Sequence, residues 1–197
     1  MIDHSDAEGD YLYRLYRASN IHTLHGRMVS GALQGRILKM LVRMIRPKRI
    51  LEVGTFSGYS AICMAEGLSD KGHLWTFDIN DEMEDFARQW IEQSPVKDRI
   101  TFLMGDANTE AAKLGFSFDL IFLDGDKRTY VQTYEQLFPL VRQGGFILAD
   151  NTLWDGHVVD PDYNHDQQTL GIMSFNDHIK QDKRVEKVIL QLRDGLT

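Results

Sequence analysis

The stretch RILEVGTFSGYS, residues 49–60, joins a short apolar run to a loop that holds two glycines. Such a run, followed by glycines and a helical pattern, predicts a β-strand, a tight turn and an α-helix. The alternation continues, with strands expected at 73–77, 99–103, 118–123 and 145–149 and helices at 57–68, 81–93, 128–140 and near 170–180. It predicts an α/β fold with a doubly wound, mostly parallel sheet that carries helices on both faces.

Two more helices are expected ahead of this alternation, at about 10–18 and 31–46, and Pro47 would end the second. The chain has 197 residues and no linker rich in Pro, Gly or Ser. Its length suits one domain. We therefore expect a single domain over 1–197, in which an N-terminal helical segment (1–46) precedes an α/β core (47–197).

The composition excludes several classes of protein. The net charge of −7 is unfavourable for a general nucleic-acid-binding protein. The single cysteine, Cys63, excludes a disulfide framework and a cysteine zinc site, and its apolar surroundings predict a place in the core. No apolar stretch approaches the ~20 residues that span a bilayer, and the N-terminus has no signal-like apolar region. These features favour a cytoplasmic protein.

Positive charge is concentrated near the N-terminus, where nine basic residues and no acidic residue lie from Tyr11 to Arg49. Four of them are spaced as on one stripe of a helix: Arg36, Lys39, Arg43 and Arg46. Ile37, Leu41 and Met44 lie on another face of the same helix. Either this basic stripe is a solvated face opposite a core-facing one, or it is a patch for an anionic partner.

Acids stand at or just beyond the ends of consecutive strands: Glu52, Asp78, Asp106, Asp124 and Asp150. Ligands of open α/β sheets bind outside the carboxyl ends of the strands. Because acids gather at this edge, we expect it to bind a polar ligand.

The first strand–helix loop has the pattern E-x-G-x-x-x-G, from Glu52 to Gly58, and lacks the three-glycine spacing of a dinucleotide-binding loop. An acid in this loop disfavours a phosphate and suits a ligand with an ammonium group. Asp78, at the end of the next strand, stands where a carboxylate binds ribose hydroxyls. A nucleoside with an amino-acid tail, such as S-adenosylmethionine, fits both positions, although glycines alone would also suit a plain tight turn.

Asp124, Asp150 and Asn151 offer three oxygen ligands at two strand ends, and oxygen ligands select hard cations such as magnesium, manganese or calcium. Adjacent strand residues point to opposite faces, so Asp150 and Asn151 can reach one ion only if the strand has already ended. An Asp-Asn pair that caps a turn is the alternative.

Four stretches resemble the cation-dependent O-methyltransferases: ILEVGTFSGYSA, GHLWTFDIN, FDLIFLDGDKRTY and GGFILADNTLWDG. This family includes the caffeoyl-CoA O-methyltransferases, their bacterial relatives and, more distantly, catechol O-methyltransferase, and the resemblance covers roughly residues 26–197. It implies the Rossmann-like fold of class I methyltransferases and S-adenosyl-L-methionine as cofactor. It also implies a divalent cation, Mg²⁺ first with Mn²⁺ or Ca²⁺ as alternatives, and a homodimer.

Carried over residue by residue, the resemblance also implies a site. Lys127 corresponds to the general base, and an adjacent dication would disfavour its ammonium form. A salt bridge between Lys127 and Asp126 is the alternative. The cation would be bound by Asp124, Asp150 and Asn151, and Trp154 and Lys127 would contact the acceptor. The cofactor would be contacted by Met28, Ser30, Glu52, Gly54, Thr55, Ser60, Asp78, Asp106, Ala107, Asp124 and Asp126.

The loop 154–168 should border the acceptor, and it carries four acids and no Lys or Arg: Asp155, Asp160, Asp162 and Asp166. These acids would repel the phosphates of a CoA thioester or a tRNA, so the loop favours a small vicinal-dihydroxy, catechol-like acceptor. Thr133 stands where the plant relatives have a substrate-contacting tyrosine. Some bacterial relatives methylate a 5-hydroxyuridine of tRNA, and the basic stripe keeps that alternative open. A non-catalytic cofactor-binding protein is a third possibility.

The segment 185–192 is expected to be the last strand, and Asp194-Gly195 is a hairpin signal. In the resembled family such a turn leads into a further strand, which is inserted beside this one. Because the sequence stops at Thr197, we expect 185–192 to lack most of one neighbouring strand. Its backbone groups on that side would be unpaired or paired with another chain.

Overall fold

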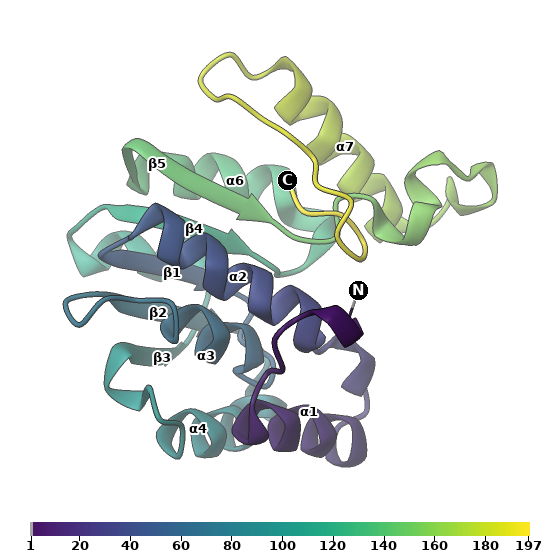
Figure 1. Ribbon diagram of the computed structural model, residues 1–197. Helices are drawn as coiled ribbons and strands as arrows, with labels where there is room; N and C mark the ends of the chain where they lie inside the picture. Colours follow the sequence, from purple (N-terminus) through teal and green to yellow (C-terminus); the bar gives the residue numbers. More distant parts are fainter. Residues whose placement is uncertain (1) are drawn as a thin grey trace. The chain divides into compact units, whose positions relative to one another are not determined.

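The computed structural model describes residues 2–197, which form two compact units (Figure 1). The N-terminal unit ends at Ala107, and the C-terminal unit runs over Asn108–Thr197. Each unit has its own strands and helices, and the prediction of a single domain stays a prediction. No helix in residues 2–197 is both long enough and apolar enough to cross a membrane.

The N-terminal unit contains three parallel strands in the order β3-β2-β1: β1 (Arg49–Val53), β2 (His73–Asp78) and β3 (Ile100–Met104). Leu51 pairs with Trp75, and Phe77 pairs with Leu103. The strands lie close to their predicted ranges, because short apolar runs between turn signals form buried parallel strands.

The helices of this unit include the two expected near the N-terminus. They are α1 (Asp10–His22), α2 (Gly31–Ile45), α3 (Tyr59–Ala65) and α4 (Glu84–Glu92), with the short 3₁₀ helices η1 (Ile2–His4), η2 (Gly26–Met28), η3 (Asp81–Met83) and η4 (Lys97–Arg99). Every residue of α3 is buried, and Cys63 lies there in the core, as predicted. Burial raises the pKa of the Cys63 thiol to about 12.

The basic stripe of α2 differs from its expected arrangement. Arg36 and Lys39 both pair with Glu66, at 3.0 and 2.8 Å, so two of its four cations are neutralised within the unit. Met44, expected on the core-facing side, is 71% exposed, whereas Leu38 and Val42 are fully buried. The buried face of α2 lies against Gly67, where a Cβ would stand 2.6 Å from the carbonyl oxygen of Lys39.

The C-terminal unit contains the parallel strands β4 (Phe118–Leu123) and β5 (Val141–Ala149), and Leu123 pairs with Ala149. Its helical elements are η6 (Lys127–Thr129), α6 (Tyr130–Leu137), η7 (Phe138–Leu140), η8 (Trp154–Val159), η9 (Pro161–Tyr163) and α7 (Gln167–Gln181), and α5 (Ala107–Glu110) and η5 (Ala111–Leu114) lie where this unit begins. Helices α6 and α7 pack through aromatic rings, with the centroids of Tyr130 and Phe175 5.3 Å apart in an edge-to-face contact.

The predicted strand over 185–192 is wrong. Residues 185–189 form no strand in the described chain, and Leu190 makes only a single antiparallel bridge with Leu196. A turn does form next to the hairpin signal, at Arg193-Asp194, where the N–H of Gly195 donates to the carbonyl of Leu192, and Thr197 then exchanges backbone hydrogen bonds with Ala149. The apolar residues of this segment are not covered by the fold, since Val188 is 67% and Ile189 46% exposed, so they do not form a buried strand.

We expect Gly35→Ala to destabilise the protein although alanine is the better helix former. The added methyl group would lie 2.6 Å from Sγ of Cys63 and 3.0 Å from a ring carbon of Tyr59. Overpacking of this kind costs about 1–3 kcal/mol, and urea unfolding measures it. In a Cys63→Ala background the same substitution should cost less, because the sulfur is gone. Equal costs in both backgrounds would contradict this packing of α2 on α3.

Candidate active site

The glycine loop after β1 needs its glycines for conformation and for space. Gly54 and Gly58 have positive φ angles of 95° and 81°, which favour glycine. The N–H of Gly54 donates to the carbonyl of Phe77, at 2.9 Å. A Cβ on Gly58 would lie 2.9 Å from Cγ1 of Ile91 in α4. The spacing E-x-G-x-x-x-G therefore describes a loop that is held against β2 and α4.

Asp78 organises this loop. Its Oδ2 accepts hydrogen bonds from the backbone N–H groups of Thr55, at 3.0 Å, and Phe56, at 2.7 Å. Its Oδ1 accepts from the N–H of Asn80, at 2.9 Å. The carboxylate is thus fixed in orientation at the end of β2, half-buried beside the loop. Its contact with a ribose stays a prediction, and its role in the loop is one that the sequence pattern did not indicate.

Glu52 lies at the end of β1 and is fully buried. Its Oε1 accepts a hydrogen bond from the hydroxyl of Ser60, at 2.6 Å. A buried carboxylate is costly unless donors or a positive charge compensate it. The pair formed by Glu52 and Ser60 could therefore hold the ammonium group of an amino-acid ligand.

The other predicted cofactor residues of the N-terminal unit occupy different settings. Met28 closes η2 and is 58% exposed, whereas Ser30 is buried just before α2. Asp106 is exposed directly after β3, and Ala107 is buried. Their contacts with a cofactor stay predictions.

The C-terminal unit places Asp124 and Asp150 side by side. Leu123 and Ala149 are register partners, so the residues that follow them leave neighbouring parallel strands at the same level. The N–H of Asp150 donates to the carbonyl of Leu123, at 2.9 Å. The hydroxyl of Tyr130 lies 3.0 Å from the carbonyl oxygen of Leu123 and 3.1 Å from that of Asp150, and so links both strand ends.

Lys127 is buried beside these strand ends. Its Nζ donates to Oδ1 of Asp124 and to the hydroxyl oxygen of Tyr130, both at 2.7 Å. The alternative of a salt bridge with Asp126 is wrong, because Asp126 pairs with Arg128 instead. Hydrogen bonds from Arg128 lower the pKa of the Asp126 carboxyl. Lys127 therefore forms its ion pair with Asp124, a predicted cation ligand, and not with Asp126.

The strand has ended before Asn151, as the proposed ligand set requires. β5 ends at Ala149, and Asn151 has a left-handed φ of 61°. Asp150 is only 4% exposed, and its Oδ1 accepts from the N–H of Asn151 at 2.9 Å. Asp150 and Asn151 are thus freed from the alternation that would point them to opposite faces.

The donor chemistry of Asp124, Asp150 and Asn151 fits a hard divalent cation. All three offer oxygen atoms, and they leave two adjacent strand ends. Burial raises the pKa of the Asp124 carboxyl, which the charge of Lys127 opposes. A cation beside Asp124 would favour its ionised form in the same way.

Tyr130 belongs to this cluster, and its only sequence signal is its place three residues after Lys127. Burial raises the pKa of its hydroxyl well above the usual value, and the charges of Asp124 and Asp150 add to this. Tyr130 therefore stays protonated and holds Lys127 in place.

The acidic loop after β5 is more ordered than its composition indicates. Asp160 accepts a hydrogen bond from the N–H of Asp162, at 3.0 Å, and Asp166 accepts from that of Thr169, at 2.7 Å. Asp160 thus caps the short helix η9, and Asp166 caps α7. His157 stacks on Tyr163 with ring centroids 3.5 Å apart. Trp154 is half-buried, and its contact with an acceptor stays a prediction.

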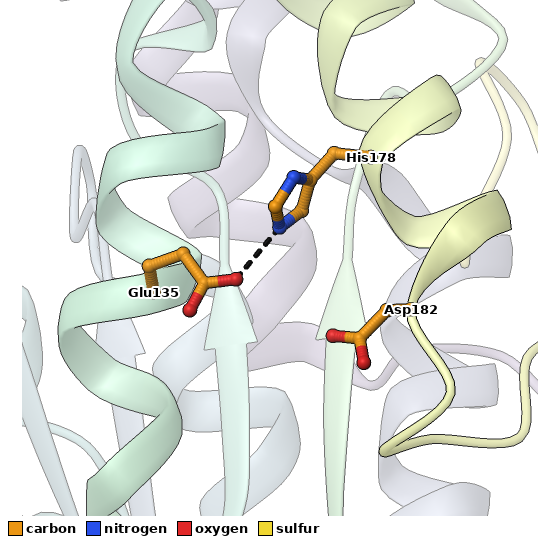
Figure 2. Close-up of side chains that lie close together, drawn as sticks. All are labelled: Glu135, His178 and Asp182. Atoms are coloured by element: carbon orange, nitrogen blue, oxygen red, sulfur yellow. Dashed lines mark hydrogen bonds and ion pairs between the residues drawn. The ribbon is translucent and has the colours of Figure 1, made fainter.

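A second group of possible metal ligands lies elsewhere in the C-terminal unit (Figure 2). His178 of α7 is 2.7 Å from Glu135 of α6, and Asp182 follows α7. Arg184 pairs with both carboxylates, at 2.5 Å from Glu135 and 2.7 Å from Asp182. Its guanidinium already supplies positive charge to the group, which we interpret as an ion-pair cluster that ties α6 to the end of α7.

Known proteins identify the family of this chain. Residues 2–197 match the family model described as O-methyltransferase. A probable caffeoyl-CoA O-methyltransferase 2 of Dictyostelium discoideum is 30% identical and aligns over 100% of this chain and 87% of its own. A caffeoyl-CoA O-methyltransferase 1 of Eucalyptus globulus is 36% identical over 86% of this chain and 73% of its own.

A solved structure gives the same result for the fold. The SAH-bound methyltransferase from Podospora anserina superimposes with a TM-score of 0.90 at 27% identity, covering 98% of this chain and 88% of that one. The chain therefore belongs to the O-methyltransferase family. Its predicted family and its α/β fold of the class I methyltransferases are both confirmed.

Asp182 should make stability depend on pH. Hydrogen bonds from Arg184 hold the pKa of the Asp182 carboxyl far below its usual range. Such a group stabilises the fold above its unfolded pKa of about 3.9 and loses this contribution as pH falls toward the folded pKa. Asp182→Asn should therefore lower the unfolding free energy at about pH 6, and the difference from wild type should shrink below about pH 4.

Urea unfolding at a series of pH values measures this difference. Asp162→Asn, which removes an equal charge from an exposed turn, is the control and should change stability little at any pH. A deficit of Asp182→Asn that is constant with pH would contradict the ion-pair role of Asp182.

Proposed function

We propose that this O-methyltransferase transfers the methyl group of S-adenosyl-L-methionine to one hydroxyl of a small vicinal-dihydroxy, catechol-like molecule, with a divalent cation. The observation that carries the proposal is the contact of buried Lys127 with half-buried Asp124, at 2.7 Å, beside the strand end that bears Asp150 and Asn151. A base next to a set of oxygen ligands suits the ionisation of a hydroxyl.

The N-terminal unit would bind the cofactor. The relative from Podospora anserina is SAH-bound, and SAH is the product that S-adenosylmethionine leaves after methyl transfer. Buried Glu52, with Ser60, suits the ammonium group, and Asp78 suits the ribose. The remaining contacts would come from Met28, Ser30, Gly54, Thr55, Asp106 and Ala107, and from Asp124 and Asp126 of the C-terminal unit.

The C-terminal unit would activate the acceptor. Asp124, Asp150 and Asn151 would hold the cation, Mg²⁺ first, with Mn²⁺ or Ca²⁺ as alternatives. When bound, it would supply charge that favours the ionised form of an acceptor hydroxyl. Lys127 Nζ, in its amine form, takes the hydroxyl proton, while Tyr130 and Asp124 hold the Nζ in position.

Methyl transfer then needs only positioning. The S–CH₃ bond of the sulfonium breaks as the O–CH₃ bond forms, which leaves SAH, a methyl ether and a proton on Lys127. No covalent enzyme intermediate is required. Cys63 takes no part, since it is buried in α3.

Charge supports a small acceptor over a phosphate-bearing one. The loop after β5 has exposed acids at Asp155 and Asp162 and no Lys or Arg. Thr133, at the position of a plant substrate-contacting tyrosine, is buried in α6. A CoA thioester would bring phosphates toward this loop, whereas a small catechol would not.

Methylation of a tRNA 5-hydroxyuridine is the second candidate, and the basic N-terminal segment supports it. Arg43 and Arg46 of the basic stripe are exposed. The pairing of Arg36 and Lys39 with Glu66 weakens this candidate, because two cations are no longer available for phosphates. A non-catalytic cofactor-binding protein is disfavoured by the complete set of Lys127 and oxygen ligands. Homodimer formation and a cytoplasmic location stay predictions.

We expect a chelator to abolish methyl transfer and Mg²⁺ or Mn²⁺ to restore it. The decisive assay compares catechols, catechol esters and hypomodified tRNA as acceptors, each with and without chelator. Asp150→Ala should reduce the rate of methyl transfer by at least roughly 10- to 100-fold, which is the effect of losing a residue that only supports a metal ligand. It should still bind cofactor, as measured by calorimetry with SAH. Full activity in excess chelator would exclude the cation.

Charge reversal of the basic stripe should separate the two acceptors. If tRNA is the substrate, replacement of Arg36, Lys39, Arg43 and Arg46 by Glu should weaken tRNA binding. The slope of the logarithm of the binding constant against the logarithm of the salt concentration should become shallower by up to about 0.7–0.9 for each phosphate that the protein no longer neutralises. Methylation of a small catechol should survive the exposed pair Arg43→Glu and Arg46→Glu. Unchanged tRNA methylation after reversal of all four would remove this patch from the tRNA hypothesis.

A further inference from the structure

Residues 194–197 run antiparallel to residues 149–154. They form backbone hydrogen bonds on both sides of the Asp150-Asn151 pair. The backbone hydrogen bonds are Ala149 N–H to Thr197 O (2.8 Å), Thr197 N–H to Ala149 O (2.9 Å), Thr152 N–H to Gly195 O (3.2 Å), and Leu153 and Trp154 N–H to Asp194 O (2.6 and 3.0 Å). A pair of bonds thus precedes the predicted cation ligands and three bonds follow them.

The turn that carries Asp194 is built for one conformation. Gly195 has a φ of 88°, and a Cβ there would lie 2.5 Å from Cγ of Leu153. Leu190 and Leu196 exchange backbone hydrogen bonds at 2.8 and 3.0 Å across the turn, and Leu196 is buried. The backbone position of Asp194 is therefore set by packing and by hydrogen bonds of the turn.

The Asp194 carboxylate faces the amide of Asn151. Nδ2 of Asn151 donates to Oδ2 of Asp194 over 3.4 Å, at the long end for a hydrogen bond. A carboxylate only accepts, so it selects the nitrogen of the amide and turns the amide oxygen away from itself. A metal ion requires the opposite atom, the oxygen.

Charges of the same turn reach the neighbouring strand end. Burial is the largest influence on the pKa of the Asp124 carboxyl and raises it; Arg193 lowers that pKa and Asp194 raises it. The turn therefore acts on ligands from both β4 and β5.

We infer that Asp194 is a positioning residue of the cation site, whose carboxylate holds the amide nitrogen of Asn151 so that the amide oxygen is presented to the ion. The inference rests on the proposed function and names how one of its ligands is oriented. Asp194 acts through Asn151 and is not itself a ligand. Its backbone carbonyl, which accepts from Leu153 and Trp154, is retained when the side chain is changed.

Direct Mn²⁺ binding to the full chain, followed by calorimetry or by electron paramagnetic resonance, tests this without an activity assay. Asp194→Ala should weaken Mn²⁺ binding about 10- to 100-fold, the range for loss of a partner that orients a ligand. Asp194→Asn keeps one accepting oxygen and should lose less. Asp162→Ala removes the same charge from an exposed residue of the loop that follows Asn151, and its Mn²⁺ affinity should stay within about twofold of the wild-type value.

A second substitution separates orientation from general damage. In Asp194→Ala/Asn151→Asp, residue 151 presents an oxygen whichever way it turns, so Mn²⁺ affinity should return to near the wild-type value. In the single variant Asn151→Asp, two carboxylates would face each other, so its affinity should be lower than that of the double variant.

Three outcomes overturn the inference: unchanged affinity in Asp194→Ala, no recovery in the double variant, or equal affinity of Asn151→Asp with and without Asp194. SAH binding and far-UV circular dichroism show whether each variant is folded, and the comparison of Asn151→Asp with the double variant stands even if Asp194→Ala is unstable. A wild-type protein that binds no Mn²⁺ and is active in chelator would instead overturn the proposed cation-dependent function.

Discussion

The parallel register of β4 and β5 is the constraint on which the C-terminal site depends. Because Leu123 lies opposite Ala149, Asp124 and Asp150 follow neighbouring strands at one level of the sheet. A buried and a half-buried carboxylate at neighbouring strand ends need positive charge or donors around them. Lys127 supplies a charge, and the Tyr130 hydroxyl links the two strand ends. A shift of the register by one residue would separate all of these groups.

The strand-end acids show that one pattern in a sequence can serve different physical roles. Asp78 uses its oxygens to accept from backbone N–H groups and thereby shapes the glycine loop. Glu52 is fully buried against Ser60, whereas Asp106 is exposed. Asp124 is paired with Lys127. The strand-end acids of the two units therefore include a loop organiser, a buried acid and an ion-paired acid, and only their local surroundings distinguish them.

The sheet strands and the main helices could be predicted because short apolar runs, glycines and helical periodicity are local signals. The predicted strand at 185–192 failed because an apolar run forms a buried strand only where the fold covers it, and Val188 and Ile189 are 67% and 46% exposed. The orientation of α2 also departed from its pattern, since close approach at Gly67 selects the face that contains Val42.

The candidate ligands and base could be named from motifs, but the residues that hold them could not. The partner of Lys127 depends on the path of the loop after β4, in which Asp126 accepts hydrogen bonds from Arg128. Asp194 stands 43 positions beyond Asn151, and nothing in the local sequence connects a turn residue to a ligand so far away. Contacts of this kind come from the tertiary fold, and periodicity carries no information about them.

The antiparallel pairing of residues 194–197 with the chain after β5 has a consequence for the order of folding. Asp150 and Asn151 acquire their conformation only when a loop of more than 40 positions closes on them, and closing it costs chain entropy before any contact is gained. During synthesis the glycine loop and Asp78 leave the ribosome together, long before Asp194 does. The two parts of the proposed site therefore mature at different times, and the part with the proposed cation ligands is the later one.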